Sequence, residues 1–439
     1  MAKEFYKKYL LALLMTIYVS NHLDRIALGL LMQDIKVDLS LSDTELGLLS
    51  GIAFAVFYAL MGIPIARWAD RGDRVFIISS TTALWSFAVA ACAAVMSFPQ
   101  FLLVRICVAV GEAGCIPPAH SLIADFFTRK ERPRAVARYV MGGSVAFFVG
   151  YFGAGWLNEF YGWRMTFVVL GLPGVVLAAL AWFTLKEPRR GRDTIEQPAV
   201  DGSSASVPVP GVKEVCVTLW ANQAFRNLLL CYSVWYFFGY GLMQWLPTFF
   251  IRSHAVTTGE IGTWFALIHG AGGALGIYVG GELASRFAPD DEARQLRAGA
   301  VAFVFFGLLT ACSLIAADYH VALGAMALAS LGGYMAQGPV LATIQTLVSP
   351  RTRATAIAII YLFANLIGYG LGPFTAGVLS DVLRPQFAEE SLRYALVILC
   401  PGYFWAAWHL VRASRTVGRE IGEVRAAPPA LARASANQR

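Results

Sequence analysis

Residues 9–33, YLLALLMTIYVSNHLDRIALGLLMQ, decide the fold class of this chain. The run is apolar over a length that, as a helix, crosses a bilayer core of about 30 Å. Asp24 and Arg25 nevertheless lie side by side within it, although charged side chains are costly at that depth. The stretch therefore predicts a membrane helix whose ionisable residues serve a function.

The rest of the chain repeats this apolar pattern. Of its 439 residues, 57% are hydrophobic and 14% are charged, whereas soluble domains contain about 25% charged residues. The segments lack the alternation of membrane β-barrel strands, so helices are expected to satisfy the backbone in the bilayer. We predict an all-α membrane protein with twelve spans, at 9–33, 44–66, 75–97, 100–124, 135–157, 164–185, 227–251, 259–283, 298–317, 321–348, 354–380 and 392–413.

Basic residues predict the orientation of these spans. Most of the 35 Lys and Arg residues lie at the termini or in loops after even-numbered spans, and Arg25 and Arg105 lie inside spans. Since positive loops stay in the cytoplasm, we expect a multi-pass protein of the cell inner membrane with both termini cytoplasmic. The net charge of +7 then reflects membrane topology and not nucleic-acid binding. The basic residues of the opposite loops are Lys36, Arg164, Arg252, Arg384 and Arg393.

The sequence divides into two similar halves. The Arg-Ala pair at Arg134, which opens the fifth span, recurs 219 residues later at Arg353, which opens the eleventh span. At the same offset of 219 residues, Gly62 corresponds to Gly281. Parallel six-span repeats with a site between them are a known transporter design. We therefore expect two pseudo-symmetric six-helix halves at 1–185 and 226–413, a cytoplasmic linker at 186–225 and a disordered cytoplasmic tail at 414–439.

Charge inside the membrane is confined to the first half. At the offset of the repeat, the charged residues and their second-half counterparts are Asp24 and Met243, Arg25 and Gln244, Arg105 and Gly324, and Glu112 and Leu331. The second half is expected to have the same architecture without these charges. They are therefore assigned to function and not to folding.

The four charged residues are expected to meet near the middle of the bilayer. Helical rise places Asp24 about 15 Å and Glu112 about 18 Å below the membrane surface, and Arg105 lies two turns from Glu112 on one helical face. Because Asp24 and Arg25 point about 100° apart, we expect Arg25 to pair with Glu112 while Asp24 faces a cavity. Protonation of either acid would release Arg25 and act as a switch. The alternative is a static ion pair that fixes helix register.

The loop GIPIARWADRGDR, residues 62–74, resembles the signature loop of the major facilitator superfamily. Gly62, Asp70, Arg71 and Arg74 are its candidate cytoplasmic-gate residues, together with Arg134. Asp70 can cap a helix and pair with Arg134, which would hold an outward-facing state together. The alternative is an ordinary basic cytoplasmic loop.

Three further motifs narrow this resemblance. NHLDR at 21–25, RICVAVGEAG at 105–114 and NLIGYGLGPFTAGVLSD at 365–381 are together similar to the Spinster-like transporters of that superfamily. The resemblance implies the major facilitator fold, lipid-like substrates such as sphingosine phosphate and lysophospholipids, and proton linkage. It also implies roles for Asp24, Arg25 and Glu112.

Candidate substrate contacts follow from polar and aromatic residues inside the spans. Tyr236 and Tyr240 lie one turn apart and could line an acyl-chain site, although aromatic stripes also serve packing. Gly372 and Pro373 permit close helix packing and a kink. The other candidate cavity residues are His120, Gln244, His269, Gln337 and Asn365.

These features predict a proton-coupled secondary active transporter that moves an amphipathic, lipid-like solute by alternating access. A transporter of small organic anions or drugs on the same fold is the alternative, although Gln244 stands where phosphate-ester exchangers carry a second arginine. A membrane enzyme or receptor is a remote alternative, because the sequence has no Walker loop, HExxH motif or nucleophile elbow. We expect a monomer in the bilayer that uses protons and a small solute, without cofactor, metal or nucleic acid.

Overall fold

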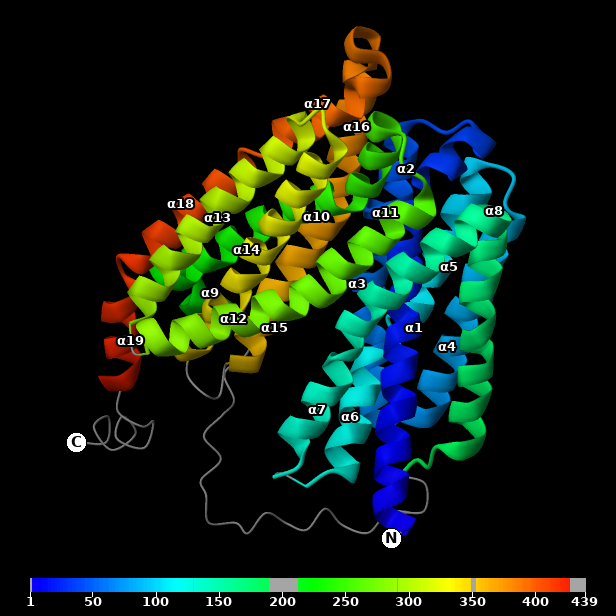
Figure 1. Cartoon of the computed structure of the whole chain (residues 1–439). Helices are drawn as coiled ribbons and strands as arrows, with labels where there is room; N and C mark the ends of the chain where they lie inside the picture. Colours follow the sequence, from blue (N-terminus) through cyan, green and yellow to red (C-terminus); the bar gives the residue numbers. More distant parts are fainter. Residues whose placement is uncertain (1, 129, 189–211, 290, 349–352, 427–439) are drawn as a thin grey trace, which may run out of the picture.

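The computed structural model describes residues 2–128, 130–188, 212–289, 291–348 and 353–426 (Figure 1). Over these ranges the chain is helical and crosses the bundle twelve times, so the predicted all-α fold is confirmed. Six of its helical stretches are, by length and composition alone, apolar enough to cross a membrane. Two of these, Arg134–Thr184 and Thr355–Ser414, each contain two of the predicted spans.

The first half contains spans one to six. Spans two, four and five are each built from two helices in line, and α8 contains the end of span five and all of span six. Gly162 separates these two parts with a φ of 78°, a conformation that favours glycine. The elements are α1 (Ala2–Leu39), α2 (Asp43–Ser50), α3 (Ile52–Arg71), α4 (Arg74–Ala91), η1 (Cys92–Ala94), α5 (Phe98–Glu112), α6 (Ile116–Phe126), α7 (Arg132–Val140) and α8 (Gly142–Thr184).

The second half contains spans seven to twelve and differs in two π-helical segments, η2 and η3, within spans eight and eleven. Such segments are frequent at functional sites. The elements are α9 (Val212–Ala221), α10 (Gln223–His254), α11 (Thr258–Phe265), η2 (Ala266–Ala271), α12 (Gly272–Phe287), α13 (Glu292–Ile315), α14 (Tyr319–Thr346), α15 (Arg353–Phe363), η3 (Ala364–Leu371), α16 (Gly372–Phe387), η4 (Ala388–Glu390), α17 (Ser391–Leu399), α18 (Gly402–Ser414) and α19 (Val417–Ala426).

The predicted linker and tail are only partly covered by the described residues. α9 lies inside the predicted linker, whose residues 189–211 are outside the described part. The prediction of a disordered tail is wrong for α19, which is helical because Val417 and Ile421, one turn apart, are buried against the second half. Glu420 fixes this helix further, since its carboxylate accepts a hydrogen bond from the Ala224 backbone amide at 2.9 Å. Residues 427–439 lie outside the described part.

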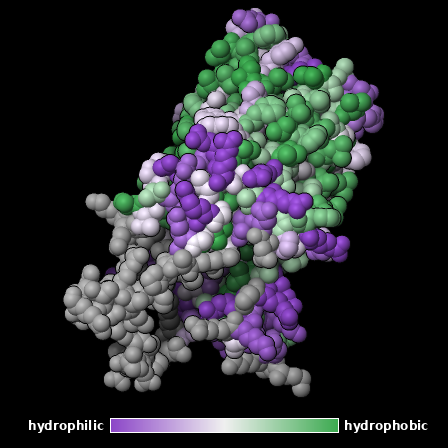
Figure 2. Space-filling view, turned by 90° about the vertical axis from the view of Figure 1, so that its left-hand side faces the viewer, coloured by the Kyte–Doolittle hydropathy of each residue, from purple (hydrophilic) through white to green (hydrophobic). Residues whose placement is uncertain are grey.

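The two halves meet at one end of the molecule and diverge toward the other. The start of α1 and the end of α19 lie at the diverging end, which we call the terminal side, and α2, α11 and α16 lie at the opposite side (Figure 1). Figure 2 shows hydrophobic residues in a broad area over the upper part of one face, with hydrophilic residues gathered below it. The two halves are therefore in contact at the opposite side and separate toward the terminal side.

A buried ion pair network closes the opposite side. The guanidinium of Arg252, on α10, donates to both carboxylate oxygens of Asp43, on α2, at 2.8 and 2.9 Å, and to Gln33 at 2.6 Å. Lys36 donates to the same carboxylate at 2.6 Å, and the Ser380 hydroxyl does so at 2.6 Å. The Asp43 side chain is 1% exposed. Asp43, an acid of the first half, therefore accepts hydrogen bonds from side chains of both halves.

Two further carboxylates join the halves by capping helices of the opposite half. Asp381, on α16, accepts from the backbone amide and the hydroxyl of Thr44 at the start of α2, at 2.7 and 2.6 Å. Glu159, on α8, accepts from the Gly259 amide at 3.2 Å and the Thr258 hydroxyl at 3.3 Å, at the start of α11. An acid at a helix N-terminus satisfies free amides and complements the helix dipole. The repeat thus places one such cap on each side of the interface.

Glycines allow the backbones of the two halves to approach at this end, and one pair gives a prediction. A Cβ at Gly155 would lie 2.6 Å from the Thr258 carbonyl oxygen, whereas a Cβ at Gly153, on the same helix, has no atom within 4 Å. We expect Gly155→Ala to disfavour closure of the opposite side because the clash is with backbone, and Gly153→Ala to leave it unchanged. The measurement is the distance between spin labels on the two halves at the opposite side. Equal distance distributions in the two variants would contradict the prediction.

Candidate transport site

Four charged side chains of α1 and α5, three of them buried and Arg25 partly exposed, form a cluster, which we call the quartet: Asp24, Arg25, Arg105 and Glu112. The Nε of Arg25 donates to the Glu112 carboxylate at 2.7 Å, and the Nη1 of Arg105 donates to the Asp24 carboxylate at 2.7 Å. Glu112 and Arg105 are fully buried and Asp24 is 2% exposed. The predicted pairing of Arg25 with Glu112 is confirmed, and the second arginine completes a set with no net formal charge.

The prediction that Asp24 faces the cavity is wrong. Its side chain lies in a small gap inside the first half, among Ser20, Trp85, Ser86 and Gly171. The reason is the angle between neighbouring helical positions, which turns Asp24 toward α4 and α8 when Arg25 is turned toward Glu112. Arg105 then compensates the Asp24 charge at that place.

Aromatic rings hold the two arginines from the side of α3. The Arg25 guanidinium lies 4.2 Å from the centroid of Phe54 and 5.0 Å from that of Tyr58, and the Arg105 guanidinium lies 5.6 Å from Phe54. Phe54 is 2% exposed. Since a desolvated cation over a ring gains about 2 kcal/mol or more, Phe54 helps to keep the fully buried Arg105 and the largely buried Arg25 in this site.

Two carboxylate oxygens of the quartet have no hydrogen-bond donor among the described residues. They are Oδ1 of Asp24 and Oε1 of Glu112. The two carboxyl groups also interact with each other. Buried acceptors without donors are rare in native proteins, and one added proton would supply the missing donor. The arrangement is therefore chemically suited to take up a proton.

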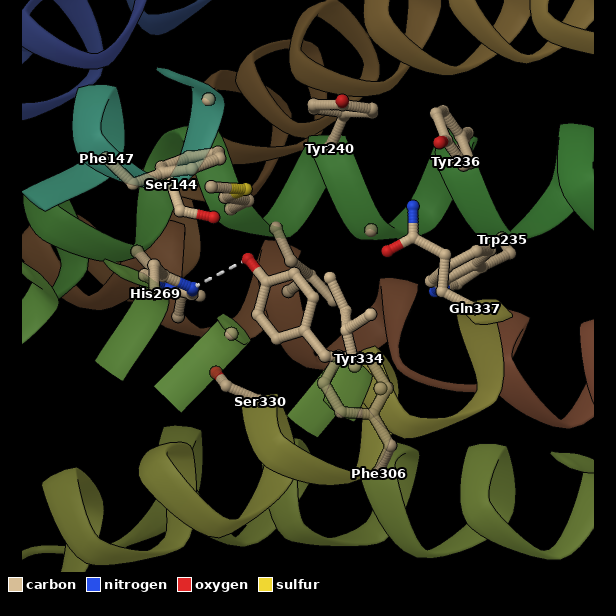
Figure 3. Close-up of a pocket in the computed structure, with 18 of the residues that line it drawn as sticks. Ser144, Phe147, Trp235, Tyr236, Tyr240, His269, Phe306, Ser330, Tyr334 and Gln337 are labelled. Carbon is tan, nitrogen blue, oxygen red and sulfur yellow. Dashed lines mark hydrogen bonds between the residues drawn. The ribbon is translucent and has the colours of Figure 1, made fainter. Parts of the chain in front are cut away.

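A separate cavity of about 320 Å³ lies mainly in the second half (Figure 3). Its lining is aromatic and apolar with a few hydroxyl, amide and imidazole groups, and contains no Asp, Glu, Lys or Arg among the described residues. α10 and α14 supply most of the wall, and α8 supplies Ser144 and Phe147 from the first half. The cavity is thus uncharged, whereas the quartet carries the intramembrane charge.

Four of the predicted cavity residues line it: Tyr236, Tyr240, His269 and Gln337. Figure 3 shows Tyr236 and Tyr240 side by side on α10 and Gln337 facing them near Trp235. His269, in η2, lies 3.4 Å from the Tyr334 hydroxyl through its Nδ1. Contact of these residues with a solute stays a prediction.

The other three predicted cavity residues lie elsewhere. His120 packs edge-on against Tyr139 with ring centroids 5.3 Å apart, and Asn365 is exposed and donates to the Tyr361 carbonyl at 2.8 Å. Gln244 is buried beside Gly29 of α1, because it takes the position that corresponds to Arg25 in the repeat. None of the three lines the cavity.

The model of the Major Facilitator Superfamily matches residues 14–416. The chain belongs to the major facilitator superfamily. It is therefore a multi-pass membrane protein and a secondary transporter, not an enzyme. The expectation drawn from the signature loop and the six-helix repeat is confirmed.

Within the superfamily the transporter is Spinster-like. The solved structure of a bacterial homologue of the human lysosomal transporter Spinster, inward-facing and unoccupied, is similar with a TM-score of 0.83 and 31% identity, covering 94% of this chain and 98% of that chain. An MFS-type efflux pump of Mycolicibacterium smegmatis is 32% identical over 384 residues, 86% of each chain. Human protein spinster homolog 1 is 25% identical over 424 residues, covering 89% of this chain and 77% of that protein.

The signature motif of the transporter, residues 62–74, covers the last half of α3, the two-residue turn after it and the first residue of α4, and its turn lies on the terminal side. Arg74 is fully buried there and binds Asp125 at 2.7 Å, the Ser121 hydroxyl at 2.9 Å and the carboxylate of Glu187. Gly62 has open space where a Cβ would lie. Asp70, Arg71 and Arg134 are exposed, and their predicted role in a latch for another conformation stays a prediction.

A second ion pair on the terminal side joins α1 to the segment before α7. The Lys7 ammonium lies 2.9 Å from the Glu131 carboxylate. This hydrogen bond, with those from Thr128, lowers the pKa of the Glu131 carboxyl to about 2. The Glu131 carboxylate therefore stays charged through the neutral range, and its ion pair joins the N-terminal end of α1 to this segment.

Gly372 and Pro373 serve close packing, as predicted. A Cβ at Gly372 would clash with the backbone of α10 at Phe237 and Gly241. The Pro373 carbonyl accepts from the Trp245 indole at 2.8 Å and faces Gly47 of α2. At this point of the transporter α16 is in close contact with both α10 and α2.

The closing network of the opposite side was not predicted from the sequence, although one signal pointed to it. The five basic residues of the opposite loops all form ion pairs with acids on that side. A basic residue in a loop where the positive-inside rule disfavours it therefore predicts a nearby acidic residue as its ion-pair partner. These residues and their partners are Lys36 and Arg252 with Asp43, Arg164 with Asp38, Arg384 with Glu389, and Arg393 with Glu390.

Proposed function

We propose that this transporter couples proton movement to the movement of an amphipathic, lipid-like solute by alternating access. The observation that supports the proton role is the quartet, with two arginines, two acids and two carboxylate oxygens that lack donors among the described residues. The observation that supports the solute class is the uncharged aromatic cavity. The two functions then reside in different halves of the molecule.

In this proposal the proton binds to Glu112 or Asp24 and changes the net charge of the quartet from zero to one. Neutralising one acid removes its attraction to an arginine, which is worth about 4 kcal/mol for charges about 4 Å apart at an effective dielectric constant of about 20. A bias of that size shifts a two-state equilibrium by roughly three orders of magnitude. The part of this attraction that differs between the two conformations is what shifts the equilibrium between them.

The solute is proposed to bind in the cavity with its apolar part against the tyrosines of α10. A volume of about 320 Å³ is at the small end for ligand pockets, so a lipid would place only part of its chain there. Arg25 is assigned to the proton site and not to a headgroup, because it is paired with Glu112 and does not line the cavity. A small organic anion is less well matched, since no basic side chain lines the cavity among the described residues.

We propose that the terminal side faces the cytoplasm at the inner membrane. The supporting argument is the concentration of basic residues on that side. The carrier described here would then be inward-facing, like the Spinster homologue it resembles. Closure at the opposite side by Asp43 and Arg252 fits that state.

A thermal-stability screen tests the solute class. We expect oleoyl lysophosphatidylcholine or sphingosine phosphate to raise the melting temperature of the purified transporter, because a ligand at 100 times its Kd adds about 2.7 kcal/mol to the free energy of unfolding. The rise should be lost in Tyr240→Ala, which alters the cavity wall. It should persist in Tyr278→Ala, a tyrosine that is 70% exposed on the outer surface of α12 and so controls for detergent-like effects. Stabilisation by galactonate or other small acids alone would overturn the lipid-like class.

A further inference from the structure

None of the four quartet residues lines the cavity, but a row of aromatic rings connects the two sites. Tyr240, in the cavity wall, packs edge-on against Tyr369 with centroids 5.1 Å apart. Tyr369 in turn packs edge-on against Phe54 at 5.7 Å, and Arg25 lies 4.2 Å above Phe54. Four side chains therefore lead from the solute site of one half to the charged site of the other.

The middle contact of this row crosses the interface between the halves. Tyr369 belongs to the π-helical segment η3 of the second half, and Phe54 belongs to α3 of the first half. The halves are in direct backbone contact next to it, where a Cβ at Gly51 would clash with the Gly370 carbonyl. The ring contact is therefore one that must change when the halves rock.

Tyr369 is also placed to respond to the charge of the quartet. It interacts electrostatically with both arginines and both acids. Its ring is 9% exposed, and its hydroxyl has no hydrogen-bond partner among the described residues. A phenylalanine at 369 would thus keep the ring contact without breaking a hydrogen bond seen here.

We infer that Tyr369, packed against Phe54, is the positioning residue that couples the cavity to the quartet, so that a change at either site alters the other through this ring contact. The inference rests on the proton-coupled function proposed above. Proton uptake weakens the Arg25–Glu112 pair and changes how Arg25 sits on Phe54. Because Tyr369 contacts Phe54, this change is transmitted to the second half. A solute that moves Tyr240 displaces the Tyr369 ring from the cavity side. Neither site needs to touch the other for the coupling to occur.

Other ionisable side chains also face the quartet and must be separated from this effect. His22 is the one whose ordinary titration range overlaps the neutral pH range, and its ring packs at a tilt against Tyr18 with centroids 4.5 Å apart. It is controlled for by His22→Gln, which should leave the pH response intact. The ionisable neighbours that interact with the quartet among the described residues are Tyr18 and His22 on α1, Tyr58 on α3, Cys92 in η1, Cys115 before α6, Tyr240 on α10 and Tyr369 on η3.

Spin-label distances between the halves test the inference without a known solute. Labels at Arg138 and Ser285, both exposed on the terminal side, are placed in the full chain with its seven cysteines replaced. We expect the distance distribution of the otherwise unaltered transporter to shift between pH 8 and pH 5.5. Phe54→Leu and Tyr369→Leu should each reduce that shift at least threefold, because they keep an apolar side chain but remove a ring. Tyr369→Phe should retain it.

Controls separate a lost contact from a damaged fold. Phe363→Leu removes a ring that is 43% exposed on α15, in the same span as Tyr369, and should leave the shift unchanged. Size-exclusion profiles and melting temperatures of all variants should stay close to those of the parent. A full shift in both Phe54→Leu and Tyr369→Leu overturns the coupling contact and leaves the proton-coupled function standing. Absence of any shift in the parent chain overturns both.

Discussion

Glu112→Gln abolishes proton-driven transport and leaves a folded protein: this is the largest effect we expect. Glutamine keeps the shape of the side chain and a hydrogen-bond acceptor for Arg25, but it cannot bind or release a proton. Glu112 is fully buried, and its Oε1 has no donor among the described residues, so the substitution fixes the quartet permanently in its proton-loaded charge state. We expect the proton-driven rate to fall at least a hundredfold.

The measurement is release of a fluorescent lysophosphatidylcholine from proteoliposomes under an imposed pH gradient, with an internal pH dye to follow protons. Asp24→Asn should give the same loss, since Asp24 is the other acid of the quartet. The matched control is Glu282→Gln, because Glu282 pairs with Arg286 on the exposed surface of α12. Full gradient-driven release by Glu112→Gln would reject the coupling role of the quartet. Release by solute exchange without a gradient should survive in both quartet variants.

The sequence was sufficient for the parts of this site that depend on local geometry. Helical rise placed Asp24, the neighbour of Arg25, and Glu112 at similar depths, and the structure pairs Arg25 with Glu112 at 2.7 Å. The same reasoning failed for Asp24, because what lies on its side of α1 depends on the packing of α1 against α4, α5 and α8, which places Arg105 and a small gap there instead of the cavity. Periodicity alone does not contain this information.

Contacts between the halves could not be predicted from the sequence, because they too depend on how helices pack. Tyr369 lies in a glycine-rich run that predicts close packing, but nothing in the run identifies Phe54 as the ring it meets. The cavity was assigned correctly for Tyr236 and Tyr240, which share a helix face, and also for His269 and Gln337, but wrongly for other single polar residues such as Asn365. A lone polar side chain in a span can hydrogen-bond its own helix, as Asn365 does, at little cost.

Opening of the opposite side is the second large effect, and we expect it from Arg252→Gln. Arg252 is 4% exposed and binds Asp43 with two hydrogen bonds across the interface. Removing one partner of a buried pair costs about 3–5 kcal/mol, which shifts the closed-to-open ratio by roughly two orders of magnitude or more. Lys36 remains beside Asp43 but belongs to the same half, so it neutralises the acid without holding the halves together.

Spin labels at Val37 and His320, both exposed on the opposite side, report this opening as a longer distance. Arg384→Gln is the matched control, since it removes an arginine of the same side whose partner Glu389 is exposed and 3.7 Å away; exposed pairs contribute at most about 1 kcal/mol. Lys36→Met should leave the distance short, because the pair that crosses the interface is intact. If Arg252→Gln and Arg384→Gln gave the same distances, the network around Asp43 would be a passive packing feature, and closure would rest on the helix caps of Asp381 and Glu159.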